Sequence, residues 1–407
     1  MRASTENRVT NTVIGQYVVW LACGLYVLAF LDYTFNLKSI RYIIYVVPLI
    51  LIGSLFFERS PKSNAPAEAY LLVYIAMGVI AYFIGIQNLL YFTNEFLIMA
   101  LVGLCFIPYL TVTRTQIRFI FFASAALLFL SYSLSGQGGI GFLEMFQTGG
   151  ITPSETAFDD NSGGLIAPIY TVFFFAVRGK IEFVMAVIMT LLGGKRIALL
   201  AILVGVVSCY VFRTFEFLQK RETRFLVLLT ALAAINIVAV HQSAIAEYLH
   251  SRLRPEAHIE EIMLGRHAFG VQIDHAMEDR SWLQSALGSG PGAATLVARF
   301  VSNGELKEVH NDWLKLVFDY GFVGSALITI FMALIFSSSR TAPAIAMTSA
   351  VIMMTDNVTI YLFYQIPVAF IVAYSRLHDP GRTKTWSALR ARRERSTLQR
   401  RVEGSFG

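Results

Sequence analysis

Residues 309–324 read V-H-N-D-W-L-K-L-V-F-D-Y-G-F-V-G and hold the polar side chains of this chain that are best placed for chemistry. His310, Asn311 and Asp312 stand together where a polar stretch gives way to an apolar helix. Polar groups at the edge of such a helix cost free energy unless they are paired or used. A histidine titrates near neutral pH, so His310 could take a proton from a hydroxyl nucleophile.

Three basic residues lie where a structural role alone does not favour them. Lys195 and Arg196 begin a predicted apolar helix of about 16 residues, where cations oppose the helix dipole by a few tenths of a kcal/mol. Arg266 falls within the apolar stripe of a predicted amphipathic helix over residues 259–277. Interfacial anchoring of the pair and snorkelling of Arg266 are the structural alternatives. An arginine can also bind phosphate oxygens through two parallel hydrogen bonds, so an anionic ligand is the sharper hypothesis.

The elements that must position these residues are membrane helices. The chain has 407 residues, of which 56% are hydrophobic and 15% charged, whereas about one quarter of a soluble domain is charged. Repeated apolar runs predict an all-α polytopic membrane protein with about twelve transmembrane helices and a large loop that contains amphipathic helices. The expected helices centre near residues 22, 48, 77, 102, 126, 170, 187, 205, 233, 325, 348 and 366.

The positions of Lys and Arg predict the orientation. With the N-terminus in the cytoplasm, about two thirds of the 33 Lys and Arg residues fall on the cytoplasmic side. Both termini are therefore expected in the cytoplasm. We expect helices 1–9 in residues 1–240, a non-cytoplasmic loop in 241–311, helices 10–12 in 312–375 and a basic tail in 376–407. The tail is interpreted as an anchor to anionic lipid rather than a nucleic-acid site.

The remaining patterns predict structure more than chemistry. His267 and His275 are about two helical turns apart, too far for the usual pair of metal ligands, so no metal site or cofactor is predicted. The three cysteines lie in apolar segments and suggest no disulfide framework. The glycine-rich segment 287–292 is expected to form a turn. Asn311 or Asp312 is expected to cap the following helix, and Lys315 to pair with Asp319 four residues later.

The segment that begins at His310 resembles a motif of the O-antigen ligase and polymerase superfamily, H-N-x-[aromatic]-L…[E/D]-x-G-x-x-G. Four further segments are similar to family features in the order expected: Lys195-Arg196-Ile-Ala-Leu-Leu at a helix start, Leu264-Gly265-Arg266, Gly288-Ser-Gly-Pro-Gly, and Asp356-Asn357. The likeness is sharp over about residues 266–324 and only topological elsewhere.

This resemblance implies a metal-independent, inverting glycosyltransferase of the bacterial inner membrane with its active site on the periplasmic face. Its donor would be an undecaprenyl-diphosphate-linked oligosaccharide. Arg196 and Arg266 would hold the diphosphate, with Lys195 beside Arg196 as a second candidate. His310 would activate the acceptor hydroxyl, and Asn311 and Asp312 would bind substrate or orient His310.

Two acceptors fit the resemblance, and one other class of protein fits the residues. A polymerase would pass the growing chain to the next lipid-linked repeat and make O-antigen or exopolysaccharide, which the motif favours. A ligase would pass the finished glycan to lipid A core. A membrane transporter could also use intramembrane charge, although its site is expected at the midplane rather than on one face.

Overall fold

The computed structural model describes residues 2–35, 37, 40–57, 64–85, 89–108, 110–134, 162–192, 196–253, 267–301, 309–356 and 358–379. Every regular element in this part of the chain is helical. The first half contains α1 (Arg2–Thr34), η1 (Arg41–Tyr45), α2 (Val46–Phe57), α3 (Ala65–Ile84), α4 (Leu89–Phe106), α5 (Arg114–Leu134), α7 (Ser162–Ala176), α8 (Lys180–Leu192) and α9 (Arg196–Thr214). The second half contains η2 (Glu216–Gln219), α10 (Arg221–Val240), α11 (Gln242–Leu253), α13 (His267–Glu278), α14 (Trp282–Leu287), α15 (Ala293–Val301), α16 (Asp312–Phe336), α17 (Ala342–Ile352), η3 (Val358–Ile360) and α18 (Leu362–Leu377).

A helix covers each of the twelve centres predicted from the apolar runs. Among the described residues, five helices are long and apolar enough to cross a membrane, namely α3, α10, α16 and the apolar parts of α1 and α9. Others are shorter: α2, α8 and α17 have 12, 13 and 11 residues. Such lengths correspond to about 16–20 Å, less than the roughly 30 Å of a hydrocarbon core. The prediction of an α-helical membrane protein therefore stands, but the structure does not bear out the count of twelve spans.

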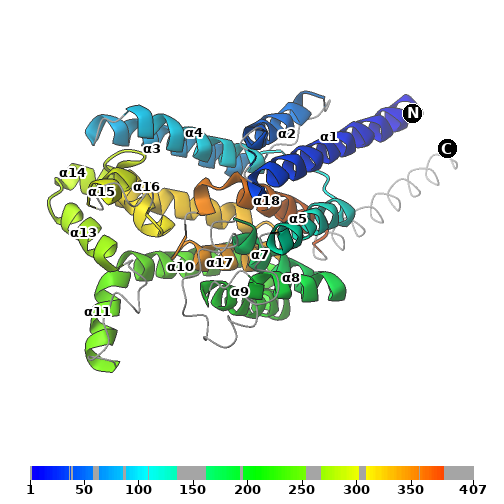
Figure 1. Ribbon diagram of the computed structural model, residues 1–407. Coiled ribbons are helices and arrows are strands. Elements are labelled where there is room, and N and C mark those ends of the chain that lie inside the picture. Colours follow the sequence, from blue (N-terminus) through cyan, green and yellow to red (C-terminus); the bar gives the residue numbers. More distant parts are fainter. Residues whose placement is uncertain are drawn as a thin grey trace, which may run out of the picture.

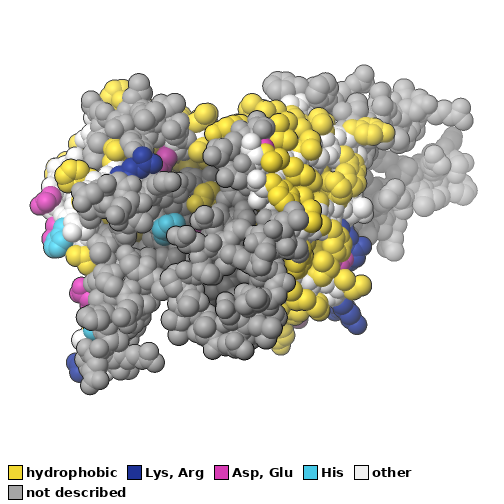
Figure 2. Space-filling model, in the orientation of Figure 1, with side chains coloured by type: hydrophobic (Ala, Val, Ile, Leu, Met, Phe, Trp, Pro, Cys, Tyr) yellow, Lys and Arg dark blue, Asp and Glu magenta, His cyan; other side chains and the backbone are white. Residues whose placement is uncertain are grey.

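The surface of the bundle agrees with contact to lipid. About a third or less of α3, α9 and α10 is buried, and the rest of these apolar helices faces outward. Large apolar side chains such as Leu72, Phe83 and Ile181 are about 70% exposed (68%, 69% and 72%). Figure 2 shows hydrophobic side chains over much of the described surface between the two ends of this face. An apolar surface of this extent in a folded protein marks an interaction site, here with the membrane.

The bundle has two distinct ends (Figure 1). Helices α11, α13, α14 and α15 lie at one end, and the N-terminus of α1 lies at the other. We call the first the loop end. At the opposite end Arg213 Nη1 donates to the Ala176 carbonyl at 2.6 Å, which joins the last turns of α9 and α7. Arg224 Nε donates to the Ser337 carbonyl at 3.2 Å, which joins the start of α10 to the end of α16. We call this the arginine end.

A second, smaller core lies at the loop end. It is formed by buried apolar residues of α10, α13, α15 and α16, together with Val309. Ile273 of α13 is fully buried and Gly270 beside it is also buried, while His275 faces outward. The second half of the predicted amphipathic helix over residues 259–277 is thus present as α13. Residues 259–266 of that prediction lie outside the described residues.

Candidate functional site

The start of α16 is held by the side chain of Asn311. Asn311 has extended backbone angles (φ −160°, ψ 99°), and its Oδ1 accepts a hydrogen bond from the Leu314 N–H at 3.0 Å. This is the geometry of an N-cap, in which a side chain satisfies a helix N–H that has no partner within the helix. Its Nδ2 donates to the Ala239 carbonyl, 2.9 Å away, near the end of α10. The predicted cap is therefore Asn311, and it also joins α16 to α10.

Asp312 is fully buried and bonded on both its main chain and side chain. Its N–H donates to the Met353 carbonyl at 2.8 Å, just after α17. Its carboxylate accepts from the Thr359 N–H at 2.9 Å and from the Thr359 hydroxyl at 2.6 Å. The indole N–H of Trp313 then donates to the Ala350 carbonyl at 2.9 Å. Three consecutive residues after His310 are thus fixed to α10, α17 and η3.

His310 is exposed, although its neighbours Val309 and Asn311 are only 3% and 2% exposed. The sequence predicted Asn311 and Asp312 as substrate-binding residues or as residues that orient the histidine. Their polar atoms bond to Ala239, Leu314 and Thr359. Both side chains are therefore buried and bonded within the protein, whereas the imidazole of the residue before them reaches the surface.

Helix packing places the first residue of α9 at the same end as His310. Mid-helix Gly205 of α9 lies so close to Thr348 of α17 that a Cβ at residue 205 would be 2.1 Å from the Thr348 hydroxyl. The end of α9 is at the arginine end, so α9 begins, and α17 ends, toward the loop end. Asp312 bonds to Met353, just past the end of α17. Arg196, as the first residue of α9, therefore shares the loop end with His310.

The other predicted basic residues cannot be placed in the site. Lys195 and Arg266 lie outside the described residues, as does the side chain of Arg196. Their convergence on His310 stays a prediction. Asp356 and Asn357 form the pair that resembles a family feature. Asp356 is buried, and Asn357 lies outside the described residues.

The predicted close ion pair of Lys315 with Asp319 does not form, although the two opposite charges still attract one another. Lys315 Nζ forms its ion pair with the Glu95 carboxylate of α4. Both oxygens of Asp319 accept instead from main-chain N–H groups, Gly292 at 3.0 Å and Ala294 at 2.8 Å, at the start of α15. The N–H groups of a helix start attract a carboxylate, and Glu95 from a neighbouring helix supplies the partner that Lys315 needs.

The glycine-rich segment forms the predicted turn and packs against a break in α16. Gly321 has φ 69° and ψ 179°, which interrupts the helix. Carbonyl groups ahead of a helix break need partners from outside, and the Phe318 and Asp319 carbonyls accept from the N–H groups of Ser289 at 3.1 Å and Gly290 at 3.0 Å. A Cβ on Gly321 would lie 2.4 Å from the Ala286 carbonyl carbon. The glycine-rich segment 287–292 and the glycine break in α16 therefore pack directly against each other.

Arg280 completes this contact from the loop. Its Nη2 donates to the Phe318 carbonyl at 2.6 Å, and its guanidinium carbon lies 3.5 Å from the centre of the Phe318 ring. Burial lowers the pKa of Arg280 to about 10, and the negative charge of Asp319 raises it by a smaller amount. The side chain therefore stays cationic at neutral pH and can stack on the ring face.

A cavity of about 370 Å³ opens beside this contact at the loop end. It is lined by Val240, His241, Asp274, Met277, Glu278, Arg280, Ser285, Val317 and Phe322. Burial raises the pKa of Asp274, and the nearby His241 lowers it by a smaller amount. The volume is within the roughly 300–1,000 Å³ of small-molecule sites, and its mixture of carboxylate, imidazole and apolar groups suits a polar ligand with many hydroxyls.

Sequence reasoning missed several of these residues. His241 and Asp274 were not singled out as site residues, because only the fold brings α10 and α13 to the same cavity. Glu95 did carry a signal, since a carboxylate in an apolar helix is a functional candidate by default. Arg280 lies in a polar loop and carried no such signal.

No family model matches this chain, and no curated protein matches its sequence.

Proposed function

We propose that the protein is a membrane glycosyltransferase that moves a glycan from undecaprenyl diphosphate to a hydroxyl acceptor, and so polymerises a surface polysaccharide. The observation that supports this most is the presentation of His310. The imidazole is exposed at the loop end, while the two residues after it are buried and hydrogen-bonded to three other elements. A group held on rigid, well-bonded neighbours is suited to proton transfer in a defined geometry.

In the proposed reaction His310 takes the proton of the acceptor hydroxyl. The acceptor oxygen bonds to the anomeric carbon of the donor sugar, and the bond from that carbon to the diphosphate oxygen breaks with inversion. Undecaprenyl diphosphate leaves with the electron pair. A positioned base contributes about 10²–10⁴-fold to such a step. Asn311 and Asp312 position His310 rather than contact the substrate.

Arg196 and Arg266 supply the donor side of the proposed site, with Lys195 as a second cation beside Arg196. Their charges would hold the diphosphate and stabilise the negative charge that grows on it as the glycosidic bond breaks. A group that stabilises developing charge contributes on the order of 10²–10³-fold. The start of α9 at the loop end supports this assignment for Arg196.

The cavity at the loop end is the proposed acceptor site. The Asp274 and Glu278 carboxylates and the Ser285 hydroxyl can accept hydrogen bonds from sugar hydroxyls, and Phe322, 59% exposed, offers an apolar face. The cavity adjoins α16 at Val317, about two helical turns from His310. An acceptor glycan that extends from this cavity would reach the imidazole with its terminal hydroxyl.

The positive-inside rule gives the proposed orientation in the bacterial inner membrane. Basic side chains that hold helix ends together gather at the arginine end, including Arg118, Arg213 and Arg224. Lys and Arg are enriched on the cytoplasmic side of membrane proteins. The arginine end and both termini would therefore face the cytoplasm, and the loop end the periplasm, with up to twelve helices in the bilayer.

Purified protein in liposomes tests the reaction and its acceptor. Undecaprenyl-diphosphate-linked repeats are supplied alone or with lipid A core, and products are separated by gel electrophoresis. A ladder from repeats alone supports a polymerase. A product that forms only with lipid A core supports a ligase. Repeats that return unchanged in both mixtures, from protein that remains folded, would contradict glycosyl transfer.

A further inference from the structure

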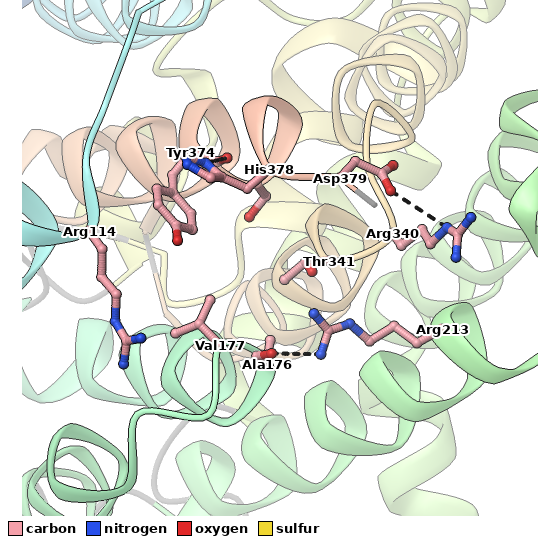
Figure 3. A pocket seen from close by; sticks show the side chains of 10 residues that line it. Arg114, Ala176, Val177, Arg213, Arg340, Thr341, Tyr374, His378 and Asp379 are labelled. Atoms are coloured by element: carbon pink, nitrogen blue, oxygen red, sulfur yellow. Dashed lines mark hydrogen bonds and ion pairs between the residues drawn. The ribbon is translucent and has the colours of Figure 1, made fainter. Parts of the chain in front are cut away.

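A second cavity, of about 220 Å³, lies at the arginine end, on the side opposite His310. It forms where α5 and α17 begin and where α7, α9 and α18 end. Arg114, Arg213 and Arg340 line it at three of these helix ends (Figure 3). Thr341, Tyr374, Ser375, His378 and Asp379 complete its polar lining. We call it the arginine pocket.

The charges of the arginine pocket favour an anion. Among the residues that the structure describes, three arginines line it and Asp379 is the one lining carboxylate. Arg340 Nε lies 3.5 Å from that carboxylate, and Arg340 Nη2 donates to Gln219 Oε1 at 3.2 Å, so part of the positive charge is neutralised and part of this guanidinium is already engaged. Arg213 uses Nη1 on the Ala176 carbonyl, which leaves further N–H groups on its guanidinium. Arginine forks match the oxygens of a phosphate group, to which they can donate two hydrogen bonds each.

Three lining residues also have buried polar atoms without a hydrogen-bond partner. These atoms are Arg114 Nε, the Ser375 hydroxyl and Arg340 Nε, and the last lies 3.5 Å from the Asp379 carboxylate. The nearest carboxylate oxygen to Arg114 is that of Glu182, 3.7 Å from Nη2. Buried donors in proteins are nearly always satisfied, and each exception needs an explanation. A ligand with several acceptor oxygens would satisfy Arg114 Nε and the Ser375 hydroxyl, which have no acceptor of their own.

The size and place of the cavity narrow the class of ligand. At about 220 Å³ it is smaller than typical pockets for drug-sized molecules. A cavity of this volume has room for a phosphate with a small substituent and is too small for a nucleotide. It also lies at the end of apolar helices, where a lipid headgroup would be found, and basic pockets between membrane helices are known to bind anionic headgroups.

We propose that the arginine pocket binds a phosphate group, carried by an anionic phospholipid of the adjacent leaflet or by a small phosphorylated solute. Arg114 and Arg213 donate to the phosphate oxygens, the Ser375 hydroxyl donates to a further oxygen, and Arg340 adds positive charge beside them. The site is separate from the proposed glycosyl transfer, since the two lie at opposite ends of the bundle.

Native mass spectrometry of the purified full chain tests this site. The probes are dioleoylphosphatidylglycerol, which is anionic, and dioleoylphosphatidylcholine, whose phosphate is neutralised by choline. Inorganic phosphate is added in a third arm, with its binding followed by the unfolding temperature. Wild-type protein is expected to bind phosphatidylglycerol in preference to phosphatidylcholine. If inorganic phosphate alone saturates the site, the ligand is a phosphorylated solute. If phosphatidylglycerol binds and inorganic phosphate does not, the ligand is the lipid.

Arg213→Gln should weaken binding about tenfold or more, because a hydrogen bond to a charged group is lost. Arg213→Lys keeps the charge without the planar fork and should give an intermediate loss. The control is Arg221→Gln, which removes an equal charge at the arginine end from a residue outside the pocket. Lipid-free unfolding temperatures confirm that each variant is folded. Equal weakening in Arg213→Gln and Arg221→Gln, or no binding of either phosphate probe, would overturn the proposal.

Discussion

Asn311 Nδ2 donates to the Ala239 carbonyl at 2.9 Å, and this bond joins the residue after His310 to the end of α10. The same side chain accepts from the Leu314 N–H at 3.0 Å and so begins α16. The Asn311 side chain therefore fixes both the start of α16 and the position of the exposed His310 just before it. A motif that resembles a catalytic signature has a structural basis in this double role.

Asn311→Ala should destabilise the protein and impair the site together. The change removes the helix cap, which costs about 0.5–2 kcal/mol, and leaves the buried Ala239 carbonyl without its donor, which costs about 1–3 kcal/mol. Asn311→Ser retains a cap and should lose less. Thermal unfolding in detergent measures the stability of both variants. Equal unfolding temperatures for wild type and Asn311→Ala would contradict the anchoring role.

Gly321→Ala should prevent the glycine-rich turn from packing against α16. Residues other than glycine strain at φ 69°, ψ 179°, at a cost of about 1–3 kcal/mol, and the new Cβ would collide with the Ala286 carbonyl carbon at 2.4 Å. Gly24→Ala in α1 is the control, because nothing lies within 4 Å of its Cβ position. We expect a clear fall in unfolding temperature for the first variant and no fall for the second. The reverse order would show that the break in α16 is not needed.

Lys315→Met should be more harmful than loss of the whole ion pair. The single change leaves the Glu95 carboxylate, only 13% exposed, without its cation. Loss of one partner of a buried pair costs about 3–5 kcal/mol, whereas removal of both charges is often far milder. The double variant Glu95→Gln, Lys315→Met should therefore recover much of the stability in a double-mutant cycle. Additive losses would mean that the two residues do not depend on one another.

Asp274 should make the fold less stable as the pH rises. Its folded-state pKa is raised, mainly by burial, so the folded protein holds this proton at pH values where the unfolded chain, with an ordinary pKa of about 3.9, releases it. The free energy of unfolding thus falls as pH rises through that window, and the loss is complete above the folded pKa. Asp274→Asn should raise the unfolding temperature at pH 7 and leave it unchanged at about pH 3.5. The opposite pH dependence would contradict this account.

The helices were predictable because lipid demands long apolar runs whose main-chain groups are satisfied internally. Each of the twelve expected centres lies in a helix, and Asn311 was among the two expected caps. The number of spans was not predictable, since α2, α8 and α17 are apolar but short. Periodicity identifies a helix, and the helix length needed to cross depends on how the bundle sits in the bilayer.

The site was predictable only where local sequence determines it. The cap at Asn311 and the turn over 287–292 follow from residue type, as does the amphipathic α13. The Lys315–Glu95 pair and the cavity beside His241 and Asp274 join segments far apart in the chain. No spacing rule connects such segments, so the i, i+4 rule paired Lys315 with Asp319, whose carboxylate instead caps α15.

The most direct test of the central claim is the rate of transfer by His310→Ala. Purified variants receive undecaprenyl-diphosphate-linked repeats and lipid A core, so that either acceptor is present, and release of undecaprenyl diphosphate is followed with time. His250→Ala is the control, since that histidine lies in α11 at the loop end, outside the motif and the cavity. We predict a loss of about 10²-fold or more for His310→Ala, with an unchanged unfolding temperature, and a wild-type rate for His250→Ala. A folded His310→Ala protein that transfers at the wild-type rate would contradict the account.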